Sequence, residues 1–152
     1  MSRAQRAKEL FTQGYACSQA VAMAFADVMQ MHEDEIAKCM LPFGGGMGRL
    51  RLTCGAVSGM AFVYGKTCVS AENTPENKSD TYAVTRELCQ KFQEQCGSLI
   101  CSDLLNAMSV PVEVGGNPEN RTQEYYKKRS CADIVYTAAE ITENFLKEKG
   151  IL

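Results

Sequence analysis

The 152-residue chain has a single histidine and no long hydrophobic run, and each of these shortages argues against a class of protein. His32 is the one histidine, and it stands among acidic residues. A cysteine–histidine hydrolase would have no other imidazole to use as its base. No apolar segment approaches the ~18 residues that a membrane-spanning helix needs. The first residues also lack the apolar core of a secretory signal, and we therefore expect a cytoplasmic protein without a membrane partner.

Neither sign of charge dominates the composition. The 16 lysines and arginines face 18 aspartates and glutamates, which gives a net charge of −2 at pH 7. This balance offers no electrostatic attraction for a phosphate backbone, and we expect no nucleic-acid partner. Apolar residues make up 45% of the chain and charged residues 22%, as in soluble globular proteins, and the length suits one domain. We predict a single cysteine-rich domain over residues 1–152.

Three cofactor signatures are missing as well. No Cys-x-x-Cys pair occurs, although zinc sites and ferredoxin clusters usually take their ligands from such pairs. Without Cys-x-x-Cys-His, attached c-type haem is not expected. The glycine-rich segment 44–48 is followed by Arg51 where a dinucleotide fingerprint needs glycine, and no strand precedes it, so we expect no nucleotide cofactor.

What the chain does have is helical periodicity, and no segment shows the sustained apolar–polar alternation of a strand. The expected helices span residues 3–13, about 17–30, a short stretch after residue 32, 54–64, about 79–95, 98–105 and about 130–149. Residues 71–78 and 110–120 are polar or rich in proline and glycine, which predicts loops. The sequence therefore predicts an all-α, single-domain bundle of six or seven helices.

Eight cysteines are the most informative residues that are present. In a reducing cytosol, cysteines are more often metal ligands, catalytic groups or core residues than structural disulfides. Those at expected loop-to-helix junctions are Cys17, Cys54, Cys101 and Cys131. A thiol at a helix N-terminus lies at the positive end of the helix dipole, which favours the reactive thiolate. The remaining cysteines are assigned to core packing: Cys39, Cys68, Cys89 and Cys96.

Three hypotheses follow for the four helix-terminal cysteines. In the first, they converge and bind an iron–sulfur cluster or another thiolate-bound metal, and transfer electrons to a redox partner protein. In the second, a pair among them carries out thiol–disulfide or peroxide chemistry, which would make the protein an oxidoreductase. In the third, the chain is a helical binding module whose cysteines only pack. The sequence leaves open whether it forms a homodimer.

Two glycines and two arginines near Cys54 are further candidates for functional residues. Gly55 and Gly59 lie four positions apart on the helix that Cys54 opens, and glycine inside a helix costs ~1 kcal/mol. Such a pair indicates the close approach of another backbone or of a cofactor, so both glycines are candidate cofactor-binding residues. Arg49 and Arg51 stand in the preceding loop, where they either lower the pKa of a neighbouring thiol or are ordinary solvated side chains.

The order of these motifs carries a resemblance to a known family. The segments concerned are residues 14–21, 44–48, 54–59 and 97–101, followed by the helix-opening Cys131. Together they resemble the redox-active protein family named C_GCAxxG_C_C, over about residues 3–148. The resemblance implies a small all-helical protein, mostly of anaerobic bacteria and archaea. The family's signature cysteines fall on Cys17, Cys54, Cys101 and Cys131.

The same resemblance implies an iron–sulfur site, because a related domain accompanies haem in a cytochrome with several redox centres. One segment departs from the family name, which is written Gly-Cys-Ala-x-x-Gly. This chain has Cys54-Gly55-Ala56-Val57-Ser58-Gly59, with the first two residues in the opposite order. Cys54 is nevertheless the cysteine that this segment offers.

Overall fold

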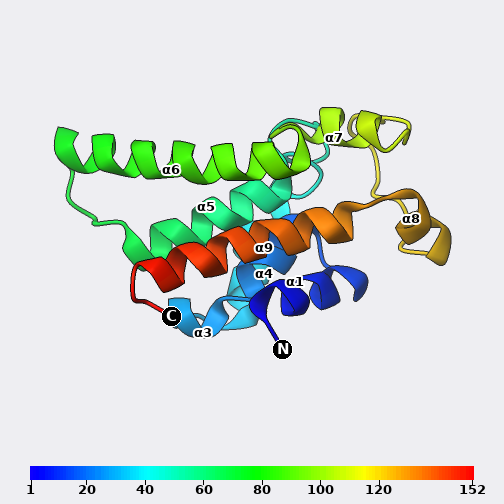
Figure 1. The fold of residues 1–152 in the computed structure, drawn as a ribbon. Coiled ribbons are helices and arrows are strands. Elements are labelled where there is room, and N and C mark those ends of the chain that lie inside the picture. The colour runs from blue at the N-terminus through cyan, green and yellow to red at the C-terminus, as the bar shows by residue number, and fades with distance from the viewer.

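The computed structural model describes all residues from Met1 to Leu152, and it is helical throughout, without a strand (Figure 1). The α-helices are α1 Arg3–Thr12, α2 Cys17–Met23, α3 Ala26–Met29, α4 Glu33–Met40, α5 Gly55–Cys68, α6 Pro75–Cys96, α7 Cys101–Ala107, α8 Gln123–Lys128 and α9 Cys131–Glu148. A single 3-10 turn, η1, spans Leu41–Phe43. The all-α prediction is confirmed, but six to seven helices were too few.

Two differences explain the larger number of helices. The segment expected as one helix over residues 17–30 breaks between α2 and α3, and Phe25 at the break is fully buried in the core. The second difference is α8, a six-residue helix that no apolar periodicity announces. Its first turn is capped by Thr122, whose side chain accepts a hydrogen bond from the N–H of Tyr125.

Helix α6 also begins earlier than the sequence pattern suggested. The helix was expected from about residue 79, whereas it starts at Pro75. Thr74 is the cap, because its hydroxyl accepts from the N–H of Asn77 at 3.1 Å. Proline is well suited to the first helical position, since the N–H it lacks would have no partner there.

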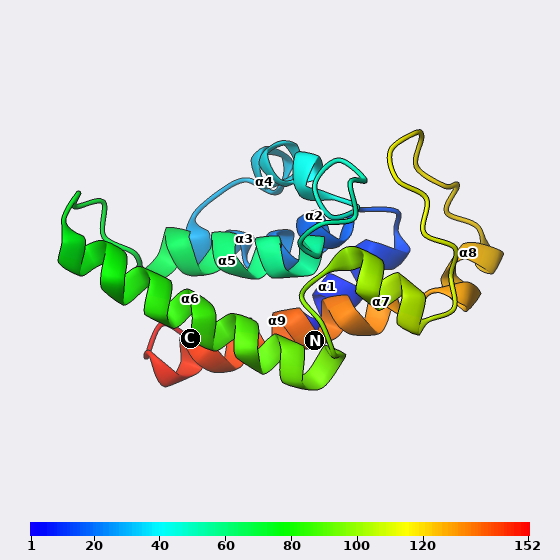
Figure 2. The same cartoon turned by 90° about the horizontal axis from the view of Figure 1, so that it is seen from above.

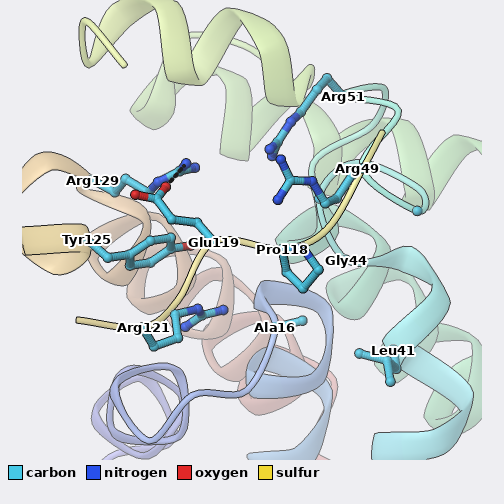
Figure 3. Close-up of a pocket in the computed structure, with 13 residues that line it drawn as sticks. Ala16, Leu41, Gly44, Arg49, Arg51, Pro118, Glu119, Arg121, Tyr125 and Arg129 are labelled. Carbon is cyan, nitrogen blue, oxygen red and sulfur yellow. Dashed lines mark hydrogen bonds and ion pairs between the residues drawn. The ribbon is translucent and has the colours of Figure 1, made fainter. Parts of the chain in front are cut away.

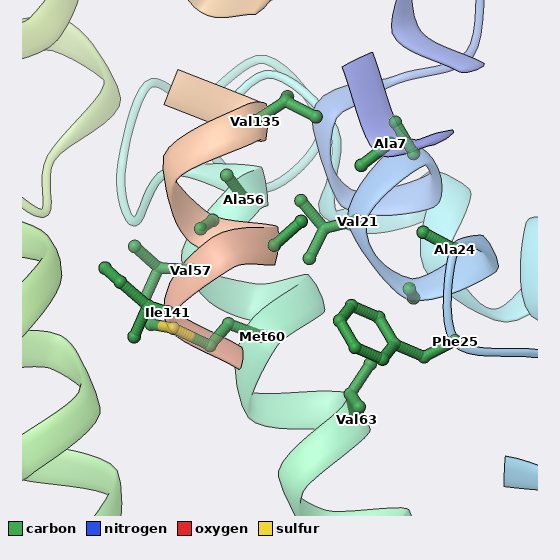
Figure 4. Close-up of a cluster of buried hydrophobic side chains, with 14 of the residues drawn as sticks. Ala7, Val21, Ala24, Phe25, Ala56, Val57, Met60, Val63, Val135 and Ile141 are labelled. Carbon is green, nitrogen blue, oxygen red and sulfur yellow. The ribbon is translucent and has the colours of Figure 1, made fainter. Parts of the chain in front are cut away.

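The core lies where α1, α2, α5 and α9 meet, and its buried side chains form one continuous cluster. Helix α9 runs through the centre and contacts α1, α2, α5 and α6. Figure 2 shows α6 and α4 on opposite sides of α5. In the close-up of the core, Val57 and Met60 of α5 lie beside Ile141 of α9 (Figure 4). No helix has both the length and the apolar character that crossing a membrane requires.

Helix α5 packs unusually close to the start of α2, and the two glycines of α5 explain why. A Cβ atom at Gly59 would lie 2.9 Å from the carbonyl oxygen of Ser18 and 3.0 Å from Cβ of Val21. A Cβ at Gly55 would lie 3.1 Å from the backbone nitrogen of Ser18 and 3.4 Å from Cβ of Cys17. This contact between backbones brings the first turn of α2 against the first turn of α5.

Candidate redox site

The four helix-terminal cysteines line one pocket, which we call the cysteine pocket. Cys17, Cys101 and Cys131 are the first residues of α2, α7 and α9, and Cys54 is the N-cap of α5. The pocket has a volume of about 70 Å³. Cys54 is buried, and the other three cysteines are half-buried. Of the two candidate glycines, Gly55 lines this pocket, whereas Gly59 does not.

A short backbone ladder joins the starts of α5 and α7. Thr53 and Ile100 form an isolated antiparallel bridge. Beside it, the N–H of Cys54 donates to the carbonyl of Leu99 at 2.8 Å. These hydrogen bonds hold the residue before α7 against the residue before α5, so Cys101 and Cys54 reach the pocket from adjacent backbone segments.

Cys17 and Cys131 lie close enough in the cysteine pocket for each to shift the pKa of the other. The neighbouring thiol is the largest influence on both groups: Cys17 lowers the pKa of Cys131, and Cys131 raises the pKa of Cys17 well above its ordinary value. The positive charges of Arg129, Arg121 and Arg51 lower the pKa of Cys131 further. Cys131 is therefore the favoured thiolate of the pair and Cys17 the favoured thiol.

The other two pocket cysteines have different surroundings. Burial raises the pKa of Cys54 to about 12, although the N–H groups of Ala56 and Val57 act in the opposite direction. Cys54 is thus a neutral thiol at physiological pH. Cys101 lies beside a cation, since the Nη1 atom of Arg51 is 3.7 Å from its sulfur.

The pocket can be tested against the metal chemistry expected from its cysteines. No group of three or more His, Cys, Asp or Glu side chains is arranged to hold a metal ion. A single ion with Zn–S bonds of ~2.3 Å needs thiolates about 3.5–4 Å apart, and the pocket does not have that arrangement. An iron–sulfur cluster puts its own iron and sulfide between the ligands, so it needs wider spacing. The donor set of four thiols near positive charge fits a cluster in its chemistry.

A wider pocket opens next to the cysteine pocket, and we call it the arginine pocket. Its volume is about 320 Å³. It shares a wall with the cysteine pocket, formed by Ala16, Gly45, Arg51, Arg121, Tyr125 and Arg129. Arg49 completes a set of four arginines around it, and Glu119 is the one carboxylate in its lining (Figure 3). The ion pair between Arg129 and Glu119 has an N–O distance of 2.8 Å.

Helix α8 positions two of these arginines around an aromatic ring. The guanidinium carbon of Arg121 is 4.8 Å from the centre of the Tyr125 ring, and that of Arg129 is 4.6 Å away. In Figure 3 the ring lies between the two side chains. Burial raises the pKa of Tyr125 to about 12. Because an aromatic face attracts cations, the neutral ring lets two like charges stand near each other.

The other two arginines come from a loop with a strained backbone. Residues with φ between 56° and 71° are Gly45, Gly46, Met47, Gly48, Arg49 and Arg51. A left-handed conformation costs a residue other than glycine roughly 1–2 kcal/mol, and it persists only where the surroundings fix it. Here the N–H of Arg51 donates to the carbonyl of Gly45 at 3.1 Å. A Cβ at Gly46 would lie 2.7 Å from Cβ of Cys101, so the loop passes directly over the cysteine pocket.

The sequence analysis identified the cysteines but missed two of the arginines. Arg49 and Arg51 were considered as neighbours of a thiol, and the structure places both in the arginine pocket. Arg121 and Arg129 were not singled out, because the short helix between them was not expected. The available signal was local: Arg129 stands two positions before the helix-opening Cys131.

Comparison of the sequence with known proteins finds a family match that covers the residues of both pockets. The sequence profile of the family described as "Putative redox-active protein (C_GCAxxG_C_C)" matches residues 15–145, which include all the pocket cysteines and arginines. The chain is also similar to an uncharacterized protein of Archaeoglobus fulgidus. The two are 28% identical over 161 residues, which cover 98% of this chain and 99% of the relative. No solved structure matches the chain.

Proposed function

The chain belongs to the C_GCAxxG_C_C family, and on that premise we propose that Cys17 and Cys131 act as a two-electron dithiol–disulfide centre. One observation carries the proposal: these two side chains line the same pocket, which they share with two further cysteines, and each is the largest influence on the pKa of the other. Two cysteines that open neighbouring helices and line one pocket are placed to form a disulfide. The first residues of α2 and α9 would be joined by that bond.

The roles within the pair follow from their surroundings. The thiolate of Cys131 attacks one sulfur of a disulfide R–S–S–R, the S–S bond breaks, and R–S⁻ leaves. Cys17 then gives up its proton and attacks the Cys131 sulfur of the mixed disulfide, releasing the second R–S⁻. The proton from Cys17 goes to one of the two released thiolates. The protein loses two electrons to form its disulfide, and the substrate gains them.

The arginines stabilise the attacking thiolate and the departing thiolate of this exchange. Positive charge from Arg121 and Arg129 stabilises the attacking thiolate and would stabilise the departing one in the same way. Tyr125 keeps these cations in place without neutralising them. The two cysteines outside the pair have no part in the proposed step.

A redox titration tests the pair directly. We expect a defined ratio of reduced to oxidised dithiothreitol to convert two thiols of the protein to one disulfide. Peptide mapping should place that disulfide between Cys17 and Cys131. Cys17→Ser and Cys131→Ser should each abolish the intramolecular couple. Cys89→Ser, which lies on α6 outside the pocket, should leave it intact. A disulfide at other positions, or a couple that survives loss of either residue, would contradict the proposal.

An iron–sulfur protein is the second candidate, and a different observation favours it. All four thiols, not two, line the cysteine pocket, and arginine charge lies next to them. The residues that would hold a cluster are Cys17, Cys54, Cys101 and Cys131. A bound cluster would supply one-electron transfer to a partner protein. The nearby guanidinium groups would offset the negative charge of a thiolate-ligated cluster.

Cys54 separates the two candidates, because only the cluster needs it. Anaerobic reconstitution with iron and sulfide should then give a coloured protein whose iron and labile sulfide are lost in Cys54→Ser and kept in Cys89→Ser. If the dithiol proposal alone holds, reconstituted protein stays colourless and Cys54→Ser keeps the two-electron couple. Iron content, sulfide content and visible absorption measure the outcome.

A further inference from the structure

Positive charge is concentrated in one place on a chain that is negative overall. The net charge is −2, yet four of the seven arginines in the sequence line the arginine pocket. Two carboxylates pair with them: Glu119 in the lining with Arg129, and Glu113 outside the lining with Arg49 at an N–O distance of 4.0 Å. A recess lined by charge of one sign concentrates the electrostatic potential and attracts ions of the opposite sign.

The fold leaves several donors of these arginines unused. The Nε atom of Arg49 is buried and has no hydrogen-bond partner. Arg51 is only 7% exposed; its Nε donates to the carbonyl of Glu113, while its Nη2 makes no hydrogen bond within the chain. A buried donor without a partner, such as Arg49 Nε, is uncommon in folded proteins. An oxyanion, with several acceptor lone pairs, is the group that guanidinium donors bind best.

The remaining two arginines are held rigidly in place. Arg121 donates to the carbonyls of Phe11 and Tyr15, at 3.0 and 3.1 Å. Arg129 is fixed by its ion pair with Glu119 and by the Tyr125 ring. The positive groups are therefore ordered before any ligand arrives, which lowers the entropy that binding would cost.

Size and position indicate what kind of anion would bind. A volume of about 320 Å³ is at the small end of the range for small-molecule sites. The shared wall means that a molecule whose anionic group lies among the arginines would extend toward Cys17 and Cys131. We propose that the arginine pocket binds the carboxylate, phosphate or sulfonate group of a small molecule, and that anionic small molecules are the preferred reactants of Cys131.

The binding site stands apart from the dithiol proposal, because it uses only the charge and shape of the pocket. Arginines that merely stabilised a thiolate would speed the reaction of Cys131 with every reagent alike. Arginines that bind an anion would speed it with anionic reagents in particular. The ratio of two alkylation rates separates these cases, since the thiolate fraction cancels.

Iodoacetate and iodoacetamide provide that ratio. With both reagents the cysteine sulfur displaces iodide and forms a C–S bond, but only iodoacetate carries a carboxylate. Mass spectrometry of the peptide that contains Cys131 gives each rate. The Cys17→Ser variant is used, so that disulfide formation plays no part. We expect the iodoacetate-to-iodoacetamide ratio to be about tenfold higher in the folded protein than in the same chain unfolded in urea.

Variants and a competing anion complete the test. Arg49→Gln and Arg129→Gln should each lower the ratio several-fold, whereas Arg86→Gln, at an exposed position on α6, should not. Inorganic phosphate should slow alkylation by iodoacetate more than sodium chloride of equal ionic strength does. Circular dichroism identifies any variant that fails to fold. If an arginine variant does not fold, the slowing of Cys131 alkylation by phosphate in the Cys17→Ser protein tests the proposal instead.

Some results would overturn the proposal. These are equal ratios in folded and unfolded chains, no effect of either arginine substitution in a folded variant, or no protection by phosphate beyond that of chloride. None of these outcomes bears on whether Cys17 and Cys131 form a disulfide, which the redox titration of the unaltered protein measures.

Discussion

At the scale of single residues, Cys54 links the stability of the fold to pH. Burial raises the pKa of Cys54 to about 12, whereas a cysteine in an unfolded chain has a pKa of ~8.5. Above pH ~8.5 the unfolded chain loses this proton while the folded chain keeps it. The contribution to stability is therefore fully present below the unfolded pKa, and it is lost as the pH rises toward the folded pKa.

This sign gives a prediction for Cys54→Ser. Between pH 7 and pH 10, the free energy of unfolding of the unaltered protein should fall by about 2 kcal/mol more than that of the variant. Urea unfolding followed by circular dichroism measures both. Cys39→Ser is the control, because Cys39 is exposed; its assignment to the core from sequence, like that of Cys68, was wrong. Parallel pH dependences for Cys54→Ser and the unaltered protein would show that burial of Cys54 has no such effect.

The residues of the candidate site were only partly predictable. Helix-terminal position was enough to identify Cys17 and Cys131, because capping and glycine signals mark helix starts in the sequence itself. Their unequal ionisation could not be predicted. It depends on the approach of Cys17 to Cys131 and on Arg121, which is ten positions away from Cys131 along the chain. Contacts of this kind are set by tertiary packing and leave no local pattern.

At the scale of helices, the close contact between α2 and α5 can be tested with two glycines of one helix. Gly59→Ala should lower the free energy of unfolding by roughly 1–3 kcal/mol, because the added methyl group would press on Ser18 and Val21 of α2. Gly65→Ala is the matched control. A Cβ there meets nothing within 4 Å, so it should stabilise the protein by roughly 0.5–1 kcal/mol through helix propensity alone.

Urea unfolding of both variants measures the difference between them. A Gly59→Ala protein as stable as Gly65→Ala would mean that α2 and α5 can move apart at no cost. If the contact also aligns the first turns of these helices, as the 3.4 Å approach of a Gly55 Cβ to Cys17 indicates, Gly59→Ala should also slow disulfide formation.

The helices that the sequence predicted well are those with a long apolar face or a clear stop. Helix α9 was expected at about residues 130–149 and spans Cys131–Glu148, with apolar residues at helical spacing along its buried side. Helix α8 was missed, because six residues are too few to show a period. The break at Phe25 was missed for the opposite reason. The apolar pattern of residues 17–30 continues across the break, where Phe25 is buried in the core.

At the scale of the whole molecule, oxidation should stabilise the fold. A bond between Cys17 and Cys131 would close a loop of more than a hundred residues, for which loss of unfolded-chain entropy predicts a gain of up to ~4–5 kcal/mol. We expect the oxidised protein to unfold at a higher temperature than the reduced protein. Cys17→Ser should show no such dependence on the oxidant. Scanning calorimetry with and without reductant measures the shift, and equal unfolding temperatures in both states would contradict the pairing.

The convergence of the four cysteines belongs to this largest scale as well. They come from α2, α5, α7 and α9, and the chain contains no Cys-x-x-Cys pair that would have placed two of them together locally. The sequence could therefore predict that each thiol opens a helix, but not how far apart the sulfur atoms lie. That spacing follows from how the helices pack, and it leaves no three ligands positioned for one metal ion.

The strained glycine loop over the cysteine pocket has one more consequence. Two of its left-handed residues, Arg49 and Arg51, are not glycines and line the arginine pocket. Hydrogen bonds from neighbouring segments hold them in that conformation. If the segments that hold the loop separate, nothing keeps Arg49 and Arg51 in the costly left-handed conformation. The backbone can then relax, and the two side chains lose their fixed direction toward the pocket. We therefore expect the arrangement of Arg49 and Arg51 around the pocket to be lost once those neighbouring segments separate, whether or not the helices have unfolded.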